Sequence, residues 1–388
     1  MENRAVSTQS PATRVALTTL QLGMGWLPEQ PGGLNRVFYN LAHYLPEAGV
    51  GVRGIVAAME GGGVVEGFAP IDTAMPQRLL AARRAIRRGL ASGPDLVASH
   101  FALYTAPGLD LLRDVPLVVH FHGPWAAESG VEGNVGVAVR AKRAIEQAVY
   151  RRAERFIVLS EAFRDVLVQR YEADPERIRL VPGGVEVERF DTGLSRLQAR
   201  QQLGWSTDRP IVICVRRLRH RMGLEDLIEA TVRLRERIPD VLVLIAGTGP
   251  IEAELDAQIE TRGLRQHVRL LGFVPDEDLP VAYRAANLSV VPTVALEGFG
   301  LIVAESLAAG TPPLVTPVGG LPEVVRDLST NLILPAHGPD ALVEGLGQAL
   351  DGTLALPSEE ACQAFARTRY DWAAVARQTR AVYEEVLG

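Results

Sequence analysis

Short apolar runs alternate with amphipathic stretches along most of the chain. Stretches with helical spacing, such as 34–49 and 161–173, separate several of these runs. In the first half, the runs that read as strands lie at residues 14–20, 51–58, 95–101, 116–122, 155–160 and 177–183. In the second half the pattern restarts, with runs at residues 210–218, 241–249, 267–274, 288–292 and 312–319. Because the strands are continuously apolar and alternate with helices, they predict parallel sheets covered on both faces, and so an α/β fold.

The restart of the pattern indicates two domains. A chain of 388 residues is too long for one hydrophobic core. We expect a flexible tail over 1–13, a first Rossmann-like domain over 14–190, a second Rossmann-like domain over 191–369 and a last helix over 370–388. The last helix can pack on either domain, the first included. Two Rossmann-like units of this kind place a ligand cleft outside the carboxyl ends of their strands.

Composition and charge are those of an ordinary globular protein. Hydrophobic residues make up 47% and charged residues 22% of the chain, and the net charge is −6. No apolar run reaches the roughly 18 residues that span a bilayer. Two cysteines, Cys214 and Cys362, do not make a disulfide framework. We therefore expect a cytoplasmic protein, and the net charge disfavours nucleic acid as a partner.

The stretch EGFGLIVAE, from Glu297 to Glu305, carries the strongest chemical signal. A glycine-rich loop connects a predicted strand to a helix that begins at Leu301, which leaves backbone N–H groups free at the positive end of the helix dipole. Two helical turns bring both carboxylates toward one cleft. Carboxylates beside an anion site favour a ligand that is also rich in hydroxyls, and a sugar nucleotide supplies both groups.

An arginine cluster follows the first strand of the second half. It consists of Arg216, Arg217, Arg219 and Arg221, and at a strand end it suits a dianion. The alternative is a solvated charge patch, but a position opposite the Glu297 loop favours the binding site. Because the chain has one lysine, Lys142, cationic chemistry falls to arginine or histidine.

Glycines and histidines mark the first-domain side of the cleft. Gly32 and Gly33 open the first helix, where bare backbone can approach an anion closely, although an ordinary turn has the same form. His122 ends a predicted parallel strand, and we place it in the active site. Trp125 and His100 are weaker candidates for acceptor contacts. No cluster of acids or cysteines accompanies the histidines, so we expect no metal site.

These motifs, in this order, resemble the family 4 (group 1) retaining glycosyltransferases of the GT-B fold, which share the E-x7-E element. The likeness covers the chain from Gly32 to Leu387 and implies two Rossmann-like domains that face each other across a cleft. The implied enzyme moves a hexosyl group from a nucleotide-diphosphate sugar, UDP or GDP being favoured, to the hydroxyl of a small-molecule, glycan or lipid-linked acceptor. It retains the anomeric configuration and uses no metal or other cofactor.

The resemblance also implies roles for individual residues. Glu305 would bind the ribose, and Glu297 and His122 the hexose near the reacting carbon. Arg217 and Arg221 would stabilise the departing diphosphate, with Glu297 as a covalent nucleophile in a less favoured variant. The donor-binding positions are Gly32, Gly33, Arg216, Gly247, Val274, Gly298, Phe299, Gly300, Leu301 and Glu305. One departure stands out, because Met222 occupies the place of the family's lysine and Arg221 must then supply the second cation.

Other interpretations stay open at this level. A GT-B sugar-nucleotide epimerase would turn over without an acceptor, and a non-catalytic sugar-nucleotide-binding protein would bind without transfer. The arginine-rich segment 78–90 reads as a solvated helix, with peripheral contact to an inner membrane face as the alternative. The sequence names neither the sugar, the base, the acceptor nor the oligomeric state.

Overall fold

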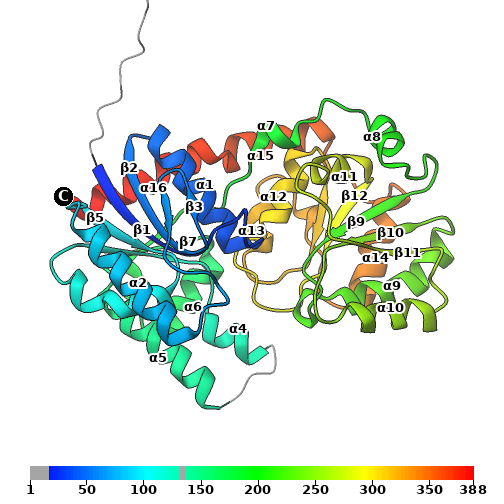
Figure 1. Ribbon diagram of the computed structural model, residues 1–388. Coiled ribbons are helices and arrows are strands. Elements are labelled where there is room, and N and C mark those ends of the chain that lie inside the picture. Colours follow the sequence, from blue (N-terminus) through cyan, green and yellow to red (C-terminus); the bar gives the residue numbers. More distant parts are fainter. Residues whose placement is uncertain (1–16, 132–135) are drawn as a thin grey trace, which may run out of the picture.

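The computed structural model describes residues 17–131 and 136–388, which form two α/β domains placed side by side (Figure 1). The predicted tail over 1–13 lies outside the described residues. Each domain has its own mainly parallel sheet covered by helices, which confirms the predicted fold class. None of the helices within the described residues combines the length and the apolar character needed to cross a membrane.

The first domain is built on an eight-stranded sheet with the strand order β3-β4-β2-β1-β5-β6-β7-β8. Its strands are β1 (Leu17–Gly25), β2 (Val50–Ala57), β3 (Gly61–Gly62), β4 (Val65–Gly67), β5 (Leu96–Ser99), β6 (Leu117–Phe121), β7 (Arg155–Val158) and β8 (Ile178–Leu180). All neighbouring pairs are parallel except β3 and β4. The β3–β4 hairpin is too short to leave an apolar run in the sequence, and the strand prediction missed it.

Helices cover both faces of this sheet. They are α1 (Gly33–Glu47), α2 (Met75–Leu90), α3 (Ala102–Thr105), α4 (Trp125–Val131), α5 (Val137–Arg152) and α6 (Glu161–Tyr171). The loops that follow β1, β5 and β6 all leave the sheet at its carboxyl edge, because these strands are parallel neighbours. That edge therefore gathers the Gly32 turn, His100 and His122.

The second domain has a five-stranded parallel sheet with the order β11-β10-β9-β12-β13. Its strands are β9 (Ile211–Val215), β10 (Leu242–Ala246), β11 (Val268–Gly272), β12 (Leu288–Val291) and β13 (Pro313–Val315). The helices around it are α7 (Val187–Phe190), α8 (Arg196–Leu203), α9 (Leu224–Arg237), α10 (Glu252–Thr261), α11 (Leu279–Ala285), α12 (Leu301–Ala308), α13 (Leu321–Val325), α14 (Pro339–Leu350) and α15 (Glu359–Tyr370). Helix α12 carries Glu305, and the loop before it carries Glu297.

The last helix, α16 (Trp372–Leu387), returns to the first domain and lies against α1 (Figure 1). Trp372 and Tyr383 are fully buried there, in a core shared with residues of α1 and β1. The chain therefore crosses between the domains twice, once between β8 and α7 and once before α16. This double crossing limits how the two halves of the cleft can move.

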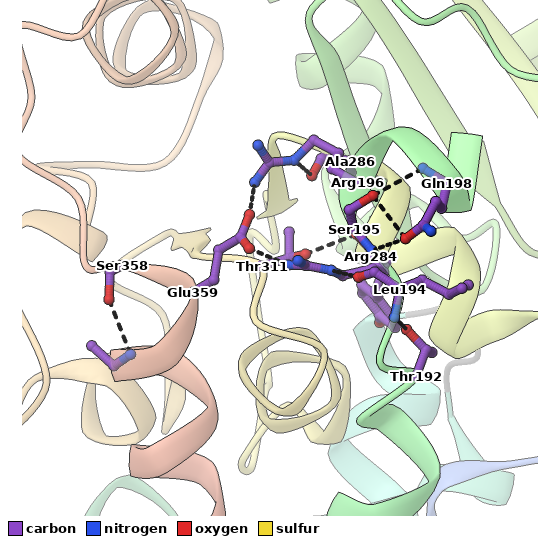
Figure 2. A network of polar contacts seen from close by, with 12 residues as sticks. Thr192, Leu194, Ser195, Arg196, Gln198, Arg284, Ala286, Thr311, Ser358 and Glu359 are labelled. Carbon is purple, nitrogen blue, oxygen red and sulfur yellow. Dashed lines mark hydrogen bonds and ion pairs between the residues drawn. The ribbon is translucent and has the colours of Figure 1, made fainter. Parts of the chain in front are cut away.

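A polar network around Glu359, at the start of α15, holds the segment between α7 and α8 (Figure 2). Arg196 and Arg284 both pair with this carboxylate. Arg284 also donates from Nε to the Leu194 carbonyl at 2.6 Å, and Arg196 donates to the Ala286 carbonyl at 3.0 Å. The segment that joins α7 to α8 is thus tied to α11 and α15.

Candidate active site

The cleft between the domains encloses about 620 Å³ and is lined from both sides. The first domain contributes the Gly32–Gly33 turn, His100, His122 and the start of α4. The second contributes the arginine segment after β9, the loops after β10 and β11, and the stretch from Leu296 to Glu305. Every residue that we predicted for the site lines this cavity.

Glu297 is held rigidly in the cleft wall. Arg216 donates from Nη2 to its carboxylate at 2.6 Å and to the Thr293 hydroxyl at 2.5 Å. Burial alone would raise the pKa of Glu297, but Arg216, Arg221 and the backbone N–H of Phe299 outweigh it and hold the pKa below its usual value. Glu297 is therefore an anion at neutral pH.

The loop before α12 offers backbone N–H groups both to Glu297 and to the cleft. The Phe299 N–H lies toward the Glu297 carboxylate and helps to lower its pKa. The Phe299 ring is buried against Tyr370. The ligand is left with the first N–H groups of α12, which begins at Leu301 after Gly300 in the left-handed conformation (φ 80°).

Glu305 lies deeper in the same wall, on α12. Its burial raises its pKa, although Arg36 and Arg189 oppose this increase. Tyr283 is its hydrogen-bond partner at 3.5 Å, which is a long contact. Glu305 thus combines a costly buried carboxyl with weak internal hydrogen bonding, and a ligand with hydroxyl donors would satisfy it better.

Some of the arginines after β9 are bonded within the protein, and Arg217 can bind a ligand. Arg216 and Arg221 are buried, which excludes a simple solvated patch. Arg221 donates to the Leu296 carbonyl at 2.8 Å and lies 3.8 Å from the Glu128 carboxylate across the cleft. Arg217 lines the cavity and makes no hydrogen bond or ion pair within the described residues. Arg217 is therefore the cation that remains available for an anionic ligand, while Met222 is buried where the resemblance places a lysine.

Glycines allow close backbone approach at two points of the cleft. Gly247 after β10 has φ 137°, and a Cβ there would lie 1.9 Å from the Arg216 carbonyl oxygen. A Cβ on Gly298 would lie 2.3 Å from the ring of Phe163 in the first domain. By contrast, a Cβ at Gly32 or Gly33 would meet no atom within 4 Å, so internal packing does not require glycine there. The absence of side chains instead lets a ligand approach the backbone of this turn.

A cross-cleft ion pair escaped the sequence analysis. Arg36 on α1 donates to both carboxylate oxygens of Asp276 at 2.8 and 3.0 Å, and Arg189 lies 3.6 Å from the same group. Asp276 follows Val274, which lines the cavity where we predicted the nucleotide base. Arg36 had no distinguishing signal, because an arginine on an amphipathic helix is ordinary in a sequence.

Three histidines gather at the carboxyl edge of the first sheet. Among the described residues, His100, His120 and His122 are the one group of three possible metal ligands, with ligand atoms within 4.8 Å of one another. Their rings are stacked, with interplanar angles of 17° to 20°. Lone pairs lie in the ring plane, so stacked rings do not aim them at a common point, and the rings bond to one another and to Gln21 and Tyr383 instead. The cluster suits a hydrogen-bond network and fits a metal poorly.

Helices α4 and α5 form the part of the cavity where we predicted the acceptor. Trp125 lines the cavity, and the Lys142 ammonium lies 4.8 Å from the centroid of its ring. Glu146 is buried beneath them, and burial raises its pKa to about 7 although the Tyr171 hydroxyl donates to it at 2.8 Å. The second carboxylate oxygen of Glu146 has no hydrogen-bond partner within the described residues.

Helix α2 contains the arginine-rich segment 78–90, for which the sequence left a solvated helix and a membrane contact as alternatives. Arg78 is buried and donates to the Ile71 carbonyl, Arg83 pairs with Asp110, and Arg88 pairs with Glu66. Arg84 and Arg87 remain exposed. Because much of the positive charge is engaged within the domain, the arrangement favours a solvated helix.

Two mainly parallel α/β domains with a cleft between them are the arrangement of the GT-B glycosyltransferases. A family model described as "Glycosyltransferase Family 4" matches residues 31–189, and one described as "Glycosyl transferases group 1" matches residues 195–369. The chain therefore belongs to this glycosyltransferase family and is an enzyme of that class.

Individual relatives agree with this assignment. The chain is 33% identical over 308 residues to a D-inositol 3-phosphate glycosyltransferase of Corynebacterium glutamicum, which covers 76% of this chain and 72% of the relative. It is 34% identical over 316 residues to the enzyme of that name from Mycobacteroides abscessus, covering 78% and 68% of the two chains.

Solved structures share the fold. Sucrose-phosphate synthase from Thermosynechococcus elongatus superposes with a TM-score of 0.79 at 23% identity, covering 95% of this chain and 99% of that one. HepE from Anabaena, solved in complex with UDP and glucose, superposes with a TM-score of 0.78 at 20% identity, covering 95% and 100% of the two chains.

Proposed function

We propose that the enzyme transfers a hexosyl group from a nucleotide-diphosphate sugar to an acceptor hydroxyl, with retention of configuration and without a metal. The observation that carries this proposal is the arrangement around Glu297. A half-buried, ionised carboxylate held by Arg216 shares one cavity with His122 of the other domain and with Arg217, whose guanidinium has no hydrogen bond or ion pair among the described residues. This set suits a ligand that has both hydroxyls and a dianion.

The donor would lie mainly on the second domain. Glu305 would accept hydrogen bonds from the ribose hydroxyls, which would replace its long contact to Tyr283. The backbone near Val274 would face the base, and the exposed Phe273 ring, which also lines the cavity, offers the base a flat apolar surface. UDP and GDP are the favoured nucleotides, and the UDP found in the Anabaena neighbour supports the first of them.

Arginine would neutralise the leaving group. Arg217, with the N–H groups of α12 and the Gly32–Gly33 turn, would stabilise the charge that builds on the departing diphosphate. Arg221 is oriented by the Leu296 carbonyl and would add a second positive charge in the place of the missing lysine. These groups supply the electrostatic role that a metal ion has in other transferases.

Retention would arise by attack on the face from which the diphosphate leaves. The acceptor oxygen bonds to the anomeric carbon as the bond from that carbon to the phosphate oxygen breaks, and the acceptor proton passes to the leaving phosphate. The Glu297 carboxylate accepts hydrogen bonds from Arg216 and from Phe299 N–H, which lowers its nucleophilicity. This engagement supports front-face attack over a covalent intermediate on Glu297.

The relatives suggest the kind of acceptor. Because they are named for D-inositol 3-phosphate, we propose a phosphorylated polyol as the acceptor here as well. On the acceptor side, Trp125 would provide a surface for the ring, and Lys142 above it is a cation close enough to attract a phosphate.

The proposal is tested in two stages. Thermal unfolding with UDP, GDP, ADP and TDP identifies the base, because a ligand that binds the folded state raises its stability. Transfer from the matching sugars to inositol 3-phosphate is then followed with and without EDTA, and the anomeric configuration of the product is read by NMR. An inverted product, loss of activity in EDTA or conversion of the donor without an acceptor would contradict the respective part of the proposal.

A further inference from the structure

A polar residue in the middle of an apolar strand connects the histidine cluster to the backbone. Gln21 lies in β1 with only 1% of its surface exposed. Its side-chain oxygen lies 2.8 Å from Nε2 of His100, and Nδ1 of His100 lies 3.0 Å from Nε2 of His122. The three side chains form a line from the core of the first domain to the wall of the cleft.

The Gly51 carbonyl and Thr19, at the end of this chain of hydrogen bonds away from the cleft, determine which atom donates in each bond. The Gly51 carbonyl can only accept, so the Thr19 hydroxyl donates to it at 3.1 Å. The Thr19 oxygen then accepts from Nε2 of Gln21 at 2.9 Å, which orients the amide with its oxygen toward His100. His100 must therefore carry its proton on Nε2 and donate it to Gln21.

The same logic continues to His122. Burial, with the neighbouring histidines, holds the pKa of His100 well below its usual range, and burial lowers the pKa of His122 to about 4. Each ring therefore has one proton at neutral pH. Because Nδ1 of His100 is then bare, it accepts from Nε2 of His122, and this leaves Nδ1 of His122 without a proton. That atom has no hydrogen-bond partner among residues 17–131 and 136–388.

We propose that Gln21 and His100 are positioning residues that hold His122 in the Nε2-protonated form, so that its Nδ1 accepts a hydrogen bond from a sugar hydroxyl in the cleft. That the ligand is a sugar rests on the proposed transfer of a hexosyl group. The hydrogen bonds from Gln21 through His100 to His122 do not depend on that proposal. The site thereby favours a donor sugar with a free hydroxyl at the contacted carbon over an analogue that lacks it, because the analogue covers the half-buried His122 and gives its Nδ1 no hydrogen bond in place of water.

The decisive variant is Gln21→Glu. A carboxylate still accepts from Nε2 of His100, but it also stabilises the imidazolium form of this ring, which then donates from Nδ1 as well. His122 must now accept at Nε2 and carry its own proton on Nδ1. The variant therefore turns the nitrogen that faces the ligand from an acceptor into a donor without removing a side chain.

Tyr383→Phe is the matched control. Tyr383 belongs to the same buried cluster, where its hydroxyl accepts from Gln21 at 3.2 Å and lies 2.7 Å from Nε2 of His120. Tyr383→Phe removes this hydroxyl from the cluster and keeps the buried ring. However, Thr19 still orients the Gln21 amide, so the proton positions on His100 and His122 should persist.

The experiment is histidine nitrogen NMR on ¹⁵N-labelled full-length protein, combined with steady-state kinetics and with UDP and GDP binding. We expect the Nε2-protonated form of His122 in the wild type and in Tyr383→Phe, and the Nδ1-protonated form in Gln21→Glu. We also expect Gln21→Glu to lower kcat by roughly tenfold or more, because one hydrogen bond between neutral groups is lost in the transition state. The affinity for nucleoside diphosphate should not change.

An unchanged His122 tautomer in a folded Gln21→Glu protein would overturn the proposal, as would a tautomer change in Tyr383→Phe. A stable Gln21→Glu protein with the expected tautomer but full activity would overturn the role in sugar binding. Failure of the wild type to transfer any sugar would refute the proposed function instead, since the NMR result does not depend on turnover.

Discussion

The buried Arg216 and the half-buried Glu297 form an ion pair with a distance of 2.6 Å between Nη2 and the carboxylate, and Thr293 shares the same guanidinium nitrogen. The pair joins the end of β9 to the loop before α12, which are the two segments of the second domain that carry the strongest chemical signals. It also holds Glu297 in one position before any ligand arrives. A preorganised carboxylate of this kind loses little entropy on binding a sugar.

Removal of one partner should be costly. Arg216→Met leaves the half-buried Glu297 carboxylate without its counter-charge, so we expect the free energy of unfolding to fall by about 2 kcal/mol, measured by urea denaturation. The double variant Arg216→Met with Glu297→Gln removes the stranded charge and should recover a large part of this loss. Single and double variants of equal stability would show that the pair is not coupled.

Arg217→Ala should affect chemistry rather than stability. Its guanidinium has no internal hydrogen bond or ion pair within the described residues, so its loss leaves no buried partner behind. We expect kcat/KM to fall by about 10²–10³, the effect of one lost electrostatic contact to a developing charge. Arg219→Ala is the control, because Arg219 belongs to the same segment but does not line the cavity. Equal effects of both substitutions would remove Arg217 from its proposed role.

The strands, the two domains and the cleft could be predicted largely from local sequence patterns. Each long strand left a continuous apolar run, and both domains followed from the restart of that pattern. The Glu297–Glu305 stretch and the arginines after β9 carry residue types and glycines that are unusual in a plain strand-to-helix turn. The prediction of the cleft therefore rested on signals that lie within a few residues of one another.

The remaining site features depend on contacts between distant segments. The Arg36–Asp276 pair joins residues 240 positions apart, and Tyr383 meets Gln21 across 362 positions. Nothing in the neighbourhood of Arg36 distinguishes it from a solvated arginine. Gln21 did leave a signal, a polar residue within the apolar strand LTTLQLGMG, but its partners emerge only when β5, β6 and α16 are brought together. The packing of side chains likewise decides which N–H groups of the Glu297 loop can bind a ligand.

Glu305 should report on nucleotide binding. Glu305→Ala removes the proposed acceptor for the ribose hydroxyls, and we expect the dissociation constant of the preferred nucleoside diphosphate to rise by roughly tenfold. Isothermal titration calorimetry measures this change directly. Glu277→Ala, an exposed acid next to Asp276, should have no effect. An unchanged affinity in Glu305→Ala would contradict the ribose assignment.

Glu146 should give the protein a distinct dependence of stability on pH. Its pKa is raised to about 7 in the folded state, mainly by burial, from a usual value of 4.5. A raised pKa means that this group's contribution is fully present below pH 4.5 and is lost as the pH rises through 7.

Glu146→Gln removes this titration. Relative to the wild type, we expect the variant to gain about 2 kcal/mol of unfolding free energy between roughly pH 5 and pH 8, measured by urea denaturation at both values. Glu154→Gln, which changes a more exposed acid near the end of the same helix, should follow the wild type. A pH profile of Glu146→Gln parallel to that of the wild type would show that Glu146 ionises normally.

The most direct test of the account is acceptor-dependent release of nucleoside diphosphate. The wild type and Arg217→Ala are incubated with UDP-glucose, UDP-N-acetylglucosamine and GDP-mannose, each with and without inositol 3-phosphate, and the released nucleotide is quantified. The account predicts release from at least one donor that requires the acceptor and falls by about 10²–10³ in Arg217→Ala. Release that is independent of the acceptor, or equal in the two proteins, would contradict the assignment of the Arg217–Glu297 cleft as a glycosyl-transfer site.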